Sequence, residues 1–259
     1  MNKPNSKVVE KLRNDEMVTS VKLNIHHPII AAQVAMAGFD LIWADMEHIP
    51  VDYNEINQVF LAAKAYGAET IVRVPRGCYS NHVRPLEMDC AAIMVPHVMS
   101  AEDARNVAYM TKFHPIGRRA IDGGFADGLY CQMGTAEYIE YANKERLTVI
   151  QIEDFEALEQ IDEIAAVPGI DMLFFGPADF AHSLGVPTRM DDERVVKARV
   201  KVAEAARKYG KYAGTVGGPG VLKDYYDMGY RYVNVSADVA ILGRSFQEIK
   251  EKCQEAMGK

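Results

Sequence analysis

The chain has 259 residues, of which 49% are hydrophobic, so it is long enough to bury a large core. Its net charge of −7 and its isoelectric point of about 5.5 argue against a partner with a phosphate backbone, such as a nucleic acid. No apolar run approaches the roughly 18 residues that a membrane-spanning helix requires.

The N-terminal stretch, residues 1–16, is polar and charged, which predicts a leading helix or a loose arm rather than a signal peptide. The four cysteines form no CxxC pair and no zinc-binding spacing. We therefore expect free thiols in a reducing cytoplasm.

Strands and helices alternate along the remainder of the chain. Apolar runs predict strands at 17–23, 41–45, 70–74, 92–95, 148–153, 172–176, 212–216 and 232–235. Helical spacing of apolar residues predicts helices at 29–37, 52–66, 81–88, 100–112, 135–145, 157–165, 190–209, 221–228 and 237–256. Eight such units predict a single (β/α)8 TIM-barrel domain over residues 1–259. An open, doubly wound sheet is the alternative, but no GxGxxG loop follows the first strand.

In such a barrel the polar residues at the C-terminal strand ends form the site. Gln151 and Glu153 end the fifth strand on one face, and Asp179 follows the sixth. Two carboxylates without an obvious arginine partner would repel each other in a dry site, and a divalent cation resolves that repulsion. An all-oxygen set suits Mg²⁺ or Mn²⁺. The alternative is that Glu153 and Asp179 are a helix N-cap and a supporting acceptor.

The second and third strands carry further candidates. Asp45, Glu47 and His48 suggest a histidine that a carboxylate orients for general acid–base work. A histidine hydrogen-bonded to a backbone carbonyl is the alternative. Arg73, in an otherwise apolar strand, needs an anion, either a carboxylate ligand or Glu47. His97, after the fourth strand, is also expected near the mouth.

The placement of lysines bears on the reaction type. A Schiff-base aldolase needs a lysine that projects into the barrel mouth. Lys22 lies within the first strand, Lys211 starts the seventh on the wrong face, and none ends strands five to eight. Carbanion chemistry in this chain would therefore depend on a metal ion.

Five motifs occur in order: A-G-F-D-L-I-W-A-D-M-E-H-I-P, I-V-R-V-P, I-M-V-P, V-I-Q-I-E and F-F-G-P-A-D-F. From about Asn24 to Phe246 the chain resembles the HpcH/HpaI aldolases, which are class II, metal-dependent pyruvate aldolases on a TIM barrel. The resemblance implies cleavage or formation of a C–C bond of 4-hydroxy-2-keto acids, giving pyruvate and an aldehyde through a metal-stabilised enolate. Oxaloacetate decarboxylation and citrate-lyase-type cleavage of an acyl-CoA are the alternatives at the same site, and a non-catalytic barrel that binds a keto acid or a protein partner is another.

The resemblance also implies roles for the residues that bind metal and keto acid. Glu153 and Asp179 match the two ligands of a divalent metal, Mg²⁺ or Mn²⁺, with Co²⁺ as a further candidate. Gln151 matches the glutamine that contacts the metal's water or the keto acid. Arg73 matches the arginine that steadies the pyruvate enolate.

Further roles follow from the same resemblance. His48 matches the general base, with Asp45 as its dyad partner. The turn of Gly176, Pro177 and Ala178 matches the one whose backbone amides receive the substrate carboxylate.

Some positions depart from the family pattern. Ile49 replaces the glycine of E-H-G-P, Asp154 replaces a common Thr or Ser, and His97 replaces an apolar residue. Glu87 stands where the family has an aspartate that reaches a neighbouring subunit's site. These departures concern the pocket for the aldehyde, so the aldehyde and the pathway stay open.

Family members form homo-oligomers, so a hexamer or trimer is expected, with the last helix packed on a neighbour. An apolar stripe at three- and four-residue spacing fits that packing, and it fits packing on the protein's own barrel wall equally well. The stripe consists of Val239, Leu242, Phe246, Ile249 and Cys253.

Overall fold

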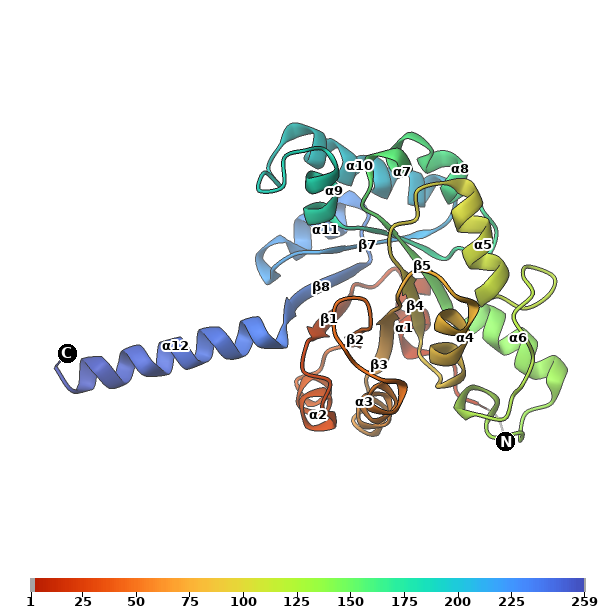
Figure 1. The fold of residues 1–259 in the computed structure, drawn as a ribbon, viewed down its shortest axis with the longest axis horizontal. Coiled ribbons are helices and arrows are strands. Elements are labelled where there is room, and N and C mark those ends of the chain that lie inside the picture. Colours follow the sequence, from red (N-terminus) through yellow and green to blue (C-terminus); the bar gives the residue numbers. More distant parts are fainter. Residues whose placement is uncertain (1–2, 259) are drawn as a thin grey trace.

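The computed structural model describes residues 3–258, and its eight parallel strands close into a barrel in the order β1 to β8, which confirms the predicted TIM barrel (Figure 1). The strands are β1 Val18–Leu23, β2 Leu41–Asp45, β3 Glu69–Arg73, β4 Ala92–Val95, β5 Leu147–Ile152, β6 Met172–Phe175, β7 Tyr212–Val216 and β8 Tyr232–Ala237. Each predicted strand is present, with ends that differ by at most two residues.

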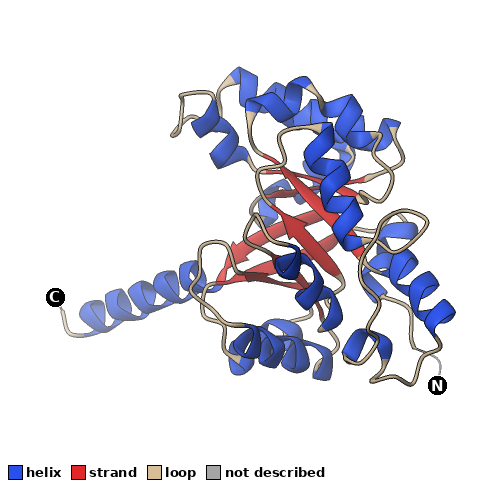
Figure 2. Cartoon of the chain, turned by 45° about the vertical axis from the view of Figure 1, so that its right-hand side comes forward, coloured by secondary structure: helices blue, strands red, loops and turns tan. Residues whose placement is uncertain are grey.

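Helices surround the sheet (Figure 2). They are α1 Lys7–Arg13, α2 Pro28–Met36, α3 Tyr53–Ala65, α4 Tyr79–Glu87, α5 Ala101–Thr111, α6 Thr135–Glu145, α7 Phe155–Glu159, α8 Ile161–Ala165, α9 Pro177–Ser183, α10 Glu193–Lys208, α11 Leu222–Met228 and α12 Asp238–Ala256. Two 3-10 turns, η1 Ala126–Gly128 and η2 Pro219–Val221, lie in the connections. The helix expected at 157–165 is broken at Gln160 into α7 and α8, and the short α9 was not predicted.

Alternate residues of the strands face the barrel interior, as the two-residue period of a strand requires. Trp43, Phe174 and Tyr232 pack there, with ring centroids 5.5 Å apart for Trp43–Phe174 and 5.6 Å for Phe174–Tyr232. These aromatic rings form an apolar floor below the C-terminal strand ends. The interior is therefore a packed core, and ligand can enter only above this floor.

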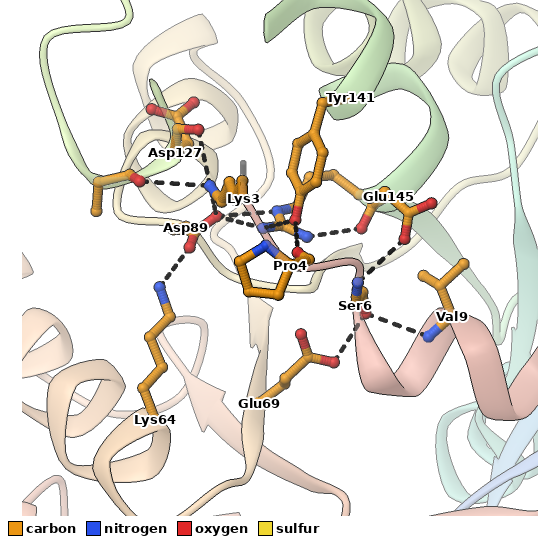
Figure 3. Close-up of polar contacts among 12 residues, drawn as sticks. Lys3, Pro4, Ser6, Val9, Lys64, Glu69, Asp89, Asp127, Tyr141 and Glu145 are labelled. Carbon is orange, nitrogen blue, oxygen red and sulfur yellow. Dashed lines mark hydrogen bonds and ion pairs between the residues drawn. The ribbon is translucent and has the colours of Figure 1, made fainter. Parts of the chain in front are cut away.

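The N-terminal end of the barrel is closed by α1, whose Val8, Val9 and Leu12 join the interior cluster. The preceding arm is held by polar contacts (Figure 3): Ser6 Oγ donates to Glu69 Oε2 at 2.7 Å, and its N–H donates to Glu145 Oε2 at 3.1 Å. These contacts lie at the end of the barrel opposite the predicted site.

Asp89 is the centre of a buried ionic cluster at this same end (Figure 3). Lys3 Nζ lies 2.6 Å from its Oδ1, Arg146 contacts the same oxygen, and Lys64 Nζ lies 2.5 Å from Oδ2. Burial opposes ionisation of Asp89, but the charges of Arg146, Lys64 and Lys3 outweigh it and lower its pKa to about 2. The cluster ties the N-terminal arm, α3 and the start of β5 to one carboxylate.

Helix α12 extends away from the barrel (Figure 1). Its apolar side chains stay exposed: Phe246 is 66% exposed, Ile249 59% and Val239 46%. These three side chains of the stripe therefore do not pack on the protein's own barrel wall.

Between residues 3 and 258, no helix combines the length and apolar character needed to cross a bilayer. Cys78, Cys90, Cys131 and Cys253 are free thiols, as predicted.

Candidate active site

Glu153 and Gln151 lie at the C-terminal end of β5 and are buried. Gln151 Nε2 donates to Glu153 Oε2 at 2.7 Å, and the backbone N–H of His97 donates to Glu153 Oε1 at 2.9 Å. Gln151 Oε1 is buried and has no hydrogen-bond partner among residues 3–258. An unsatisfied buried acceptor is costly, so this oxygen indicates a missing donor or cation at the site.

The carboxylate of Asp179 lies in the first turn of α9, is exposed, and is close enough to Glu153 to affect its ionisation. Burial raises the pKa of Glu153 to about 7. The His97 N–H and imidazole oppose this rise, Asp179 reinforces it, and Arg73 opposes it. Two neighbouring carboxylates, one of them reluctant to ionise, form a site that a divalent cation would stabilise.

Because Gly176 has no side chain, the Glu153 side chain can lie directly against its backbone. A Cβ at this position would lie 2.6 Å from Glu153 Oε2 and 3.0 Å from Glu153 Cβ. The Gly176 N–H donates to Ile152 O at 3.2 Å, and Pro177 has no N–H. Of the three residues expected to present backbone amides, only Ala178 keeps an N–H free of intrahelical partners, because it lies in the first turn of α9.

Arg73 forms a two-point ion pair with Asp45 inside the barrel. Its Nε lies 3.0 Å from Asp45 Oδ1 and its Nη2 lies 2.7 Å from Oδ2, while Nη1 lies 3.0 Å from Glu47 Oε2. Burial lowers the pKa of the guanidinium, but the bonds to Asp45 and the charge of Glu47 raise it overall. The pairing follows from the sheet register, which places Asp45 and Arg73 side by side on β2 and β3.

His48 lies in the connection after β2, with 61% of its side chain exposed. Its Nε2 is 3.5 Å from Glu47 Oε2, and no contact with Asp45 is present in the part of the chain that the structure describes. The expected pairing of His48 with Asp45 is not among the observed contacts. Asp45 faces inward, where its carboxylate is paired with Arg73 and Lys22. Glu47 is the carboxylate that can orient His48.

His97 is part of the site, as its position after β4 predicted. Its Nδ1 lies 3.0 Å from Asp154 Oδ2, and its Nε2 lies 3.9 Å from Glu47 Oε1. The residue has φ of 51°, a left-handed conformation that is uncommon outside glycine, and in it the N–H reaches Glu153. Burial lowers the pKa of His97, but Asp154 and Glu153 raise it overall.

The sequence analysis did not place two residues of the site. Lys22 projects into the mouth from β1, with its Nζ 2.6 Å from Asp45 Oδ2 and 6.0 Å from the centre of the Trp43 ring. His26 Nε2 accepts the Asp45 N–H at 3.1 Å. The expectation that no lysine reaches the mouth was wrong. The two-residue period of a strand could have placed Lys22 there, because Lys22 lies two residues after Ser20, which faces inward.

Glu87, the expected cross-subunit residue, ends α4 away from this mouth. It is half-buried beside a cavity of about 250 Å³ that Tyr53, Arg84 and Phe125 also line. Burial raises the pKa of Glu87, the charge of Arg119 opposes the rise, and nearby acids reinforce it.

The donor set at β5 and α9 fits a hard divalent cation with few protein ligands. Within residues 3–258, no group of three or more His, Cys, Asp or Glu side chains is arranged to hold a metal. Glu153 and Asp179 form a two-carboxylate set, and Gln151 Oε1 supplies a further oxygen. Such a set leaves coordination positions for water and substrate oxygens.

Comparisons with known proteins agree with this arrangement. Residues 21–240 match the family model described as HpcH/HpaI aldolase/citrate lyase. The chain is 32% identical to a 2-dehydro-3,6-dideoxy-6-sulfogluconate aldolase of Pseudomonas putida, over 85% of this chain and 86% of that one. It is 28% identical to a hydroxypyruvate/pyruvate aldolase of Pseudomonas aeruginosa, over 96% and 93% of the two chains. The crystal structure of an HpcH/HpaI aldolase from Desulfitobacterium hafniense superposes with a TM-score of 0.89 at 29% identity, covering 95% of this chain and 96% of that one.

These relationships imply a divalent metal as cofactor and a small molecule as substrate. A model match over most of the chain, with relatives at about one-third identity, decides the family and the reaction class. The chain belongs to the HpcH/HpaI aldolase/citrate lyase family and is a carbon–carbon lyase.

Proposed function

We propose that the protein cleaves and forms the C3–C4 bond of 4-hydroxy-2-keto acids, with pyruvate as one product and an aldehyde as the other. The observation that carries the proposal is the buried Glu153 carboxylate beside Asp179, with the unsatisfied Gln151 Oε1 next to them. Glu153 and Asp179 would hold Mg²⁺ or Mn²⁺, with Co²⁺ as a further candidate. A bound divalent cation would supply positive charge to the keto oxygen, where negative charge develops as the bond breaks.

Arg73 shares that task. Its guanidinium is fixed by Asp45 and Glu47, and each terminal nitrogen keeps a second N–H that those carboxylates do not require. An N–H held in place by two carboxylates needs no reorganisation when charge develops on the keto oxygen. The Ala178 N–H is in a position to receive the substrate carboxylate at the start of α9.

His48 is the proposed general base. In cleavage it would accept the proton of the C4 hydroxyl, the C3–C4 electrons would move to C3, and C3 would then take up a proton to give pyruvate. Glu47 would orient the imidazole, while Asp45 would act on the site through Arg73. In this proposal Asp45 is a positioning residue.

The choice of reaction rests on family and site together. Relatives named hydroxypyruvate/pyruvate aldolase and 2-keto-3-deoxy-L-rhamnonate aldolase favour cleavage to a keto acid and an aldehyde. Oxaloacetate decarboxylation and acyl-CoA cleavage would use the same carboxylates, but no observation favours either over the aldol reaction.

The exposed stripe of α12 supports a homo-oligomer, a hexamer or trimer. In that assembly Glu87, on the outer edge of α4, would reach a neighbouring subunit's site. The four free thiols support a cytoplasmic location.

The test is to incubate metal-stripped protein with 4-hydroxy-2-oxopentanoate, with and without added Mn²⁺ or Mg²⁺, and to follow pyruvate. We expect cleavage only when metal is added. Cleavage without metal would contradict the proposal, and so would a protein that binds the keto acid but cleaves it under neither condition.

A further inference from the structure

The β1 wall of the barrel mouth carries a cation to which the proposed reaction assigns no role. Lys22 faces inward, its side chain is 19% exposed, and its Nζ contacts Asp45 Oδ2 at 2.6 Å. One of the three N–H donors of the ammonium meets this oxygen. No second carboxylate lies within ion-pair distance among residues 3–258, so two donors remain to face the mouth.

The order of the strands places Lys22 opposite the proposed metal ligands. In a closed barrel of eight strands, β1 and β5 are four strands apart in either direction, and β3 lies midway between them. Glu153 is at the end of β5, Arg73 is on β3 and Lys22 is on β1. Arg73 Nη2 and Lys22 Nζ contact the same oxygen of Asp45, at 2.7 and 2.6 Å, so a substrate that reaches Arg73 from the Glu153 side can extend its far end, the part that becomes the aldehyde, to Lys22.

The charges of the mouth depend on Lys22 as well. Asp45 and Glu47 are balanced by Arg73 and Lys22, and a divalent cation would balance Glu153 and Asp179. Loss of Lys22 would make the net charge of the mouth more negative by one. The added negative charge would repel a dianionic substrate more strongly than a monoanionic one.

From this geometry, and given the function proposed above, we propose that Lys22 determines substrate specificity by binding an anionic group on the aldehyde-derived part of the substrate. A carboxylate offers two acceptor oxygens for the two free N–H donors, and hydrogen bonds to an ionised acceptor are stronger than those to a neutral hydroxyl. The structure thus points to aldehydes that carry a terminal carboxylate as the preferred class of partner for pyruvate.

The experiment compares matched aldehydes in the direction of C–C bond formation. Glyoxylate is paired with acetaldehyde, and 4-oxobutanoate with butanal, so that a methyl group replaces the carboxylate in each pair. The ratio of kcat/KM values within a pair is measured for the wild type, Lys22→Met and Lys22→Arg. Lys223→Met, which removes an exposed lysine of α11 paired only with Asp227, is the matched control.

We expect the wild type to favour the carboxylate member of at least one pair. Lys22→Met should lower that ratio about 10- to 150-fold, since a hydrogen bond to a charged group contributes about 1.5–3 kcal/mol. Lys22→Arg and Lys223→Met should keep it. If Lys22→Met lowers both members of a pair equally, the lysine acts only by positioning Asp45 and Arg73, and the inference is wrong. An unchanged ratio overturns it too.

A second measurement separates this inference from the proposed reaction. Exchange of the C3 hydrogens of pyruvate in D₂O with Mn²⁺, followed by NMR, requires the reaction machinery but no aldehyde. If exchange is absent, the proposed reaction fails, and Lys22 is then tested by the binding of 2-oxopentanedioate and 2-oxopentanoate to the Mn²⁺-containing protein. Loss of preference for the dianion in Lys22→Met supports the inference, and an unchanged preference contradicts it.

Discussion

Replacement of Gly176 by alanine tests how the proposed metal site is built. The backbone of Gly176 has φ of −96° and ψ of 89°, so an L-residue meets no left-handed strain there. The added Cβ would lie 2.6 Å from Glu153 Oε2 and 3.0 Å from Glu153 Cβ. Ordinary contacts between such atoms are about 3.5–4.0 Å, so the carboxylate must move by roughly 1 Å.

The displacement has two consequences that can be measured separately. Overpacking in a closed barrel costs about 1–3 kcal/mol of the free energy of unfolding. Metal ligands tolerate deviations of only about 0.2 Å, so loss of the Gln151–Glu153 geometry should weaken Mn²⁺ binding by about 10- to 100-fold. Mn²⁺ affinity from titration calorimetry and the free energy of unfolding from urea denaturation report the two effects.

Gly218→Ala is the matched control, because Gly218 lies in the connection after β7 at the same end of the barrel and its Cβ would meet no atom within 4 Å. We expect its metal affinity and turnover to equal those of the wild type. If Gly176→Ala binds Mn²⁺ within twofold of the wild type and keeps its turnover, Glu153 is not a ligand held in place by this glycine.

Three further predictions concern the site residues, the Asp89 cluster and α12. Glu153→Ala should abolish Mn²⁺ binding, whereas His48→Ala should keep it and lose about 10²- to 10⁴-fold in aldol turnover; equal metal affinity of wild type and Glu153→Ala would overturn the ligand assignment. Asp89→Asn should cost about 3–5 kcal/mol of the free energy of unfolding by urea, because it leaves the buried Lys3 and Arg146, and the more exposed Lys64, without their carboxylate. Since the pKa of Asp89 falls from 3.8 to about 2 on folding, its stabilisation is complete above pH 3.8 and is lost as the pH falls through 2, so Asp89→Asn should flatten the acid limb of a stability–pH profile. Charge introduced by Phe246→Glu with Ile249→Glu should reduce the mass measured by light scattering, and an unchanged mass would exclude the α12 stripe from subunit contacts.

The sequence was sufficient to predict the barrel because it contains eight apolar runs of strand length, as a TIM barrel requires, and polar residues follow several of them. Their bounds agree with the structure to within two residues, since Gly and Pro mark the ends of most elements. Helix α9 was not predicted because its seven residues are too few to show a period, although Pro177 at its first position is a typical helix start.

Pairing among charged side chains was harder to predict than their presence at the mouth. The alternatives for Arg73 included Glu47, which it does contact, but its two-point partner is Asp45. That choice depends on the register of β2 against β3, which sets Asp45 beside Arg73 and which no local pattern encodes. The same register draws Asp45 away from His48.

Lys22 changes the reasoning about reaction type without reversing its outcome. From the sequence we expected a metal partly because no lysine was placed in the mouth, and the structure places Lys22 there. Lys22 Nζ is paired with Asp45 at 2.6 Å, and Lys22 lies on β1, across the barrel from Glu153. The proposed metal therefore rests on Glu153, Asp179 and the unsatisfied Gln151 Oε1, and no longer on the lack of a lysine. Because Lys22 and Arg73 share Asp45, any substrate group that draws the ammonium away from this carboxylate also alters the charge that steadies Arg73. Under the proposed roles, recognition of the aldehyde and stabilisation of the keto acid would be coupled through Asp45.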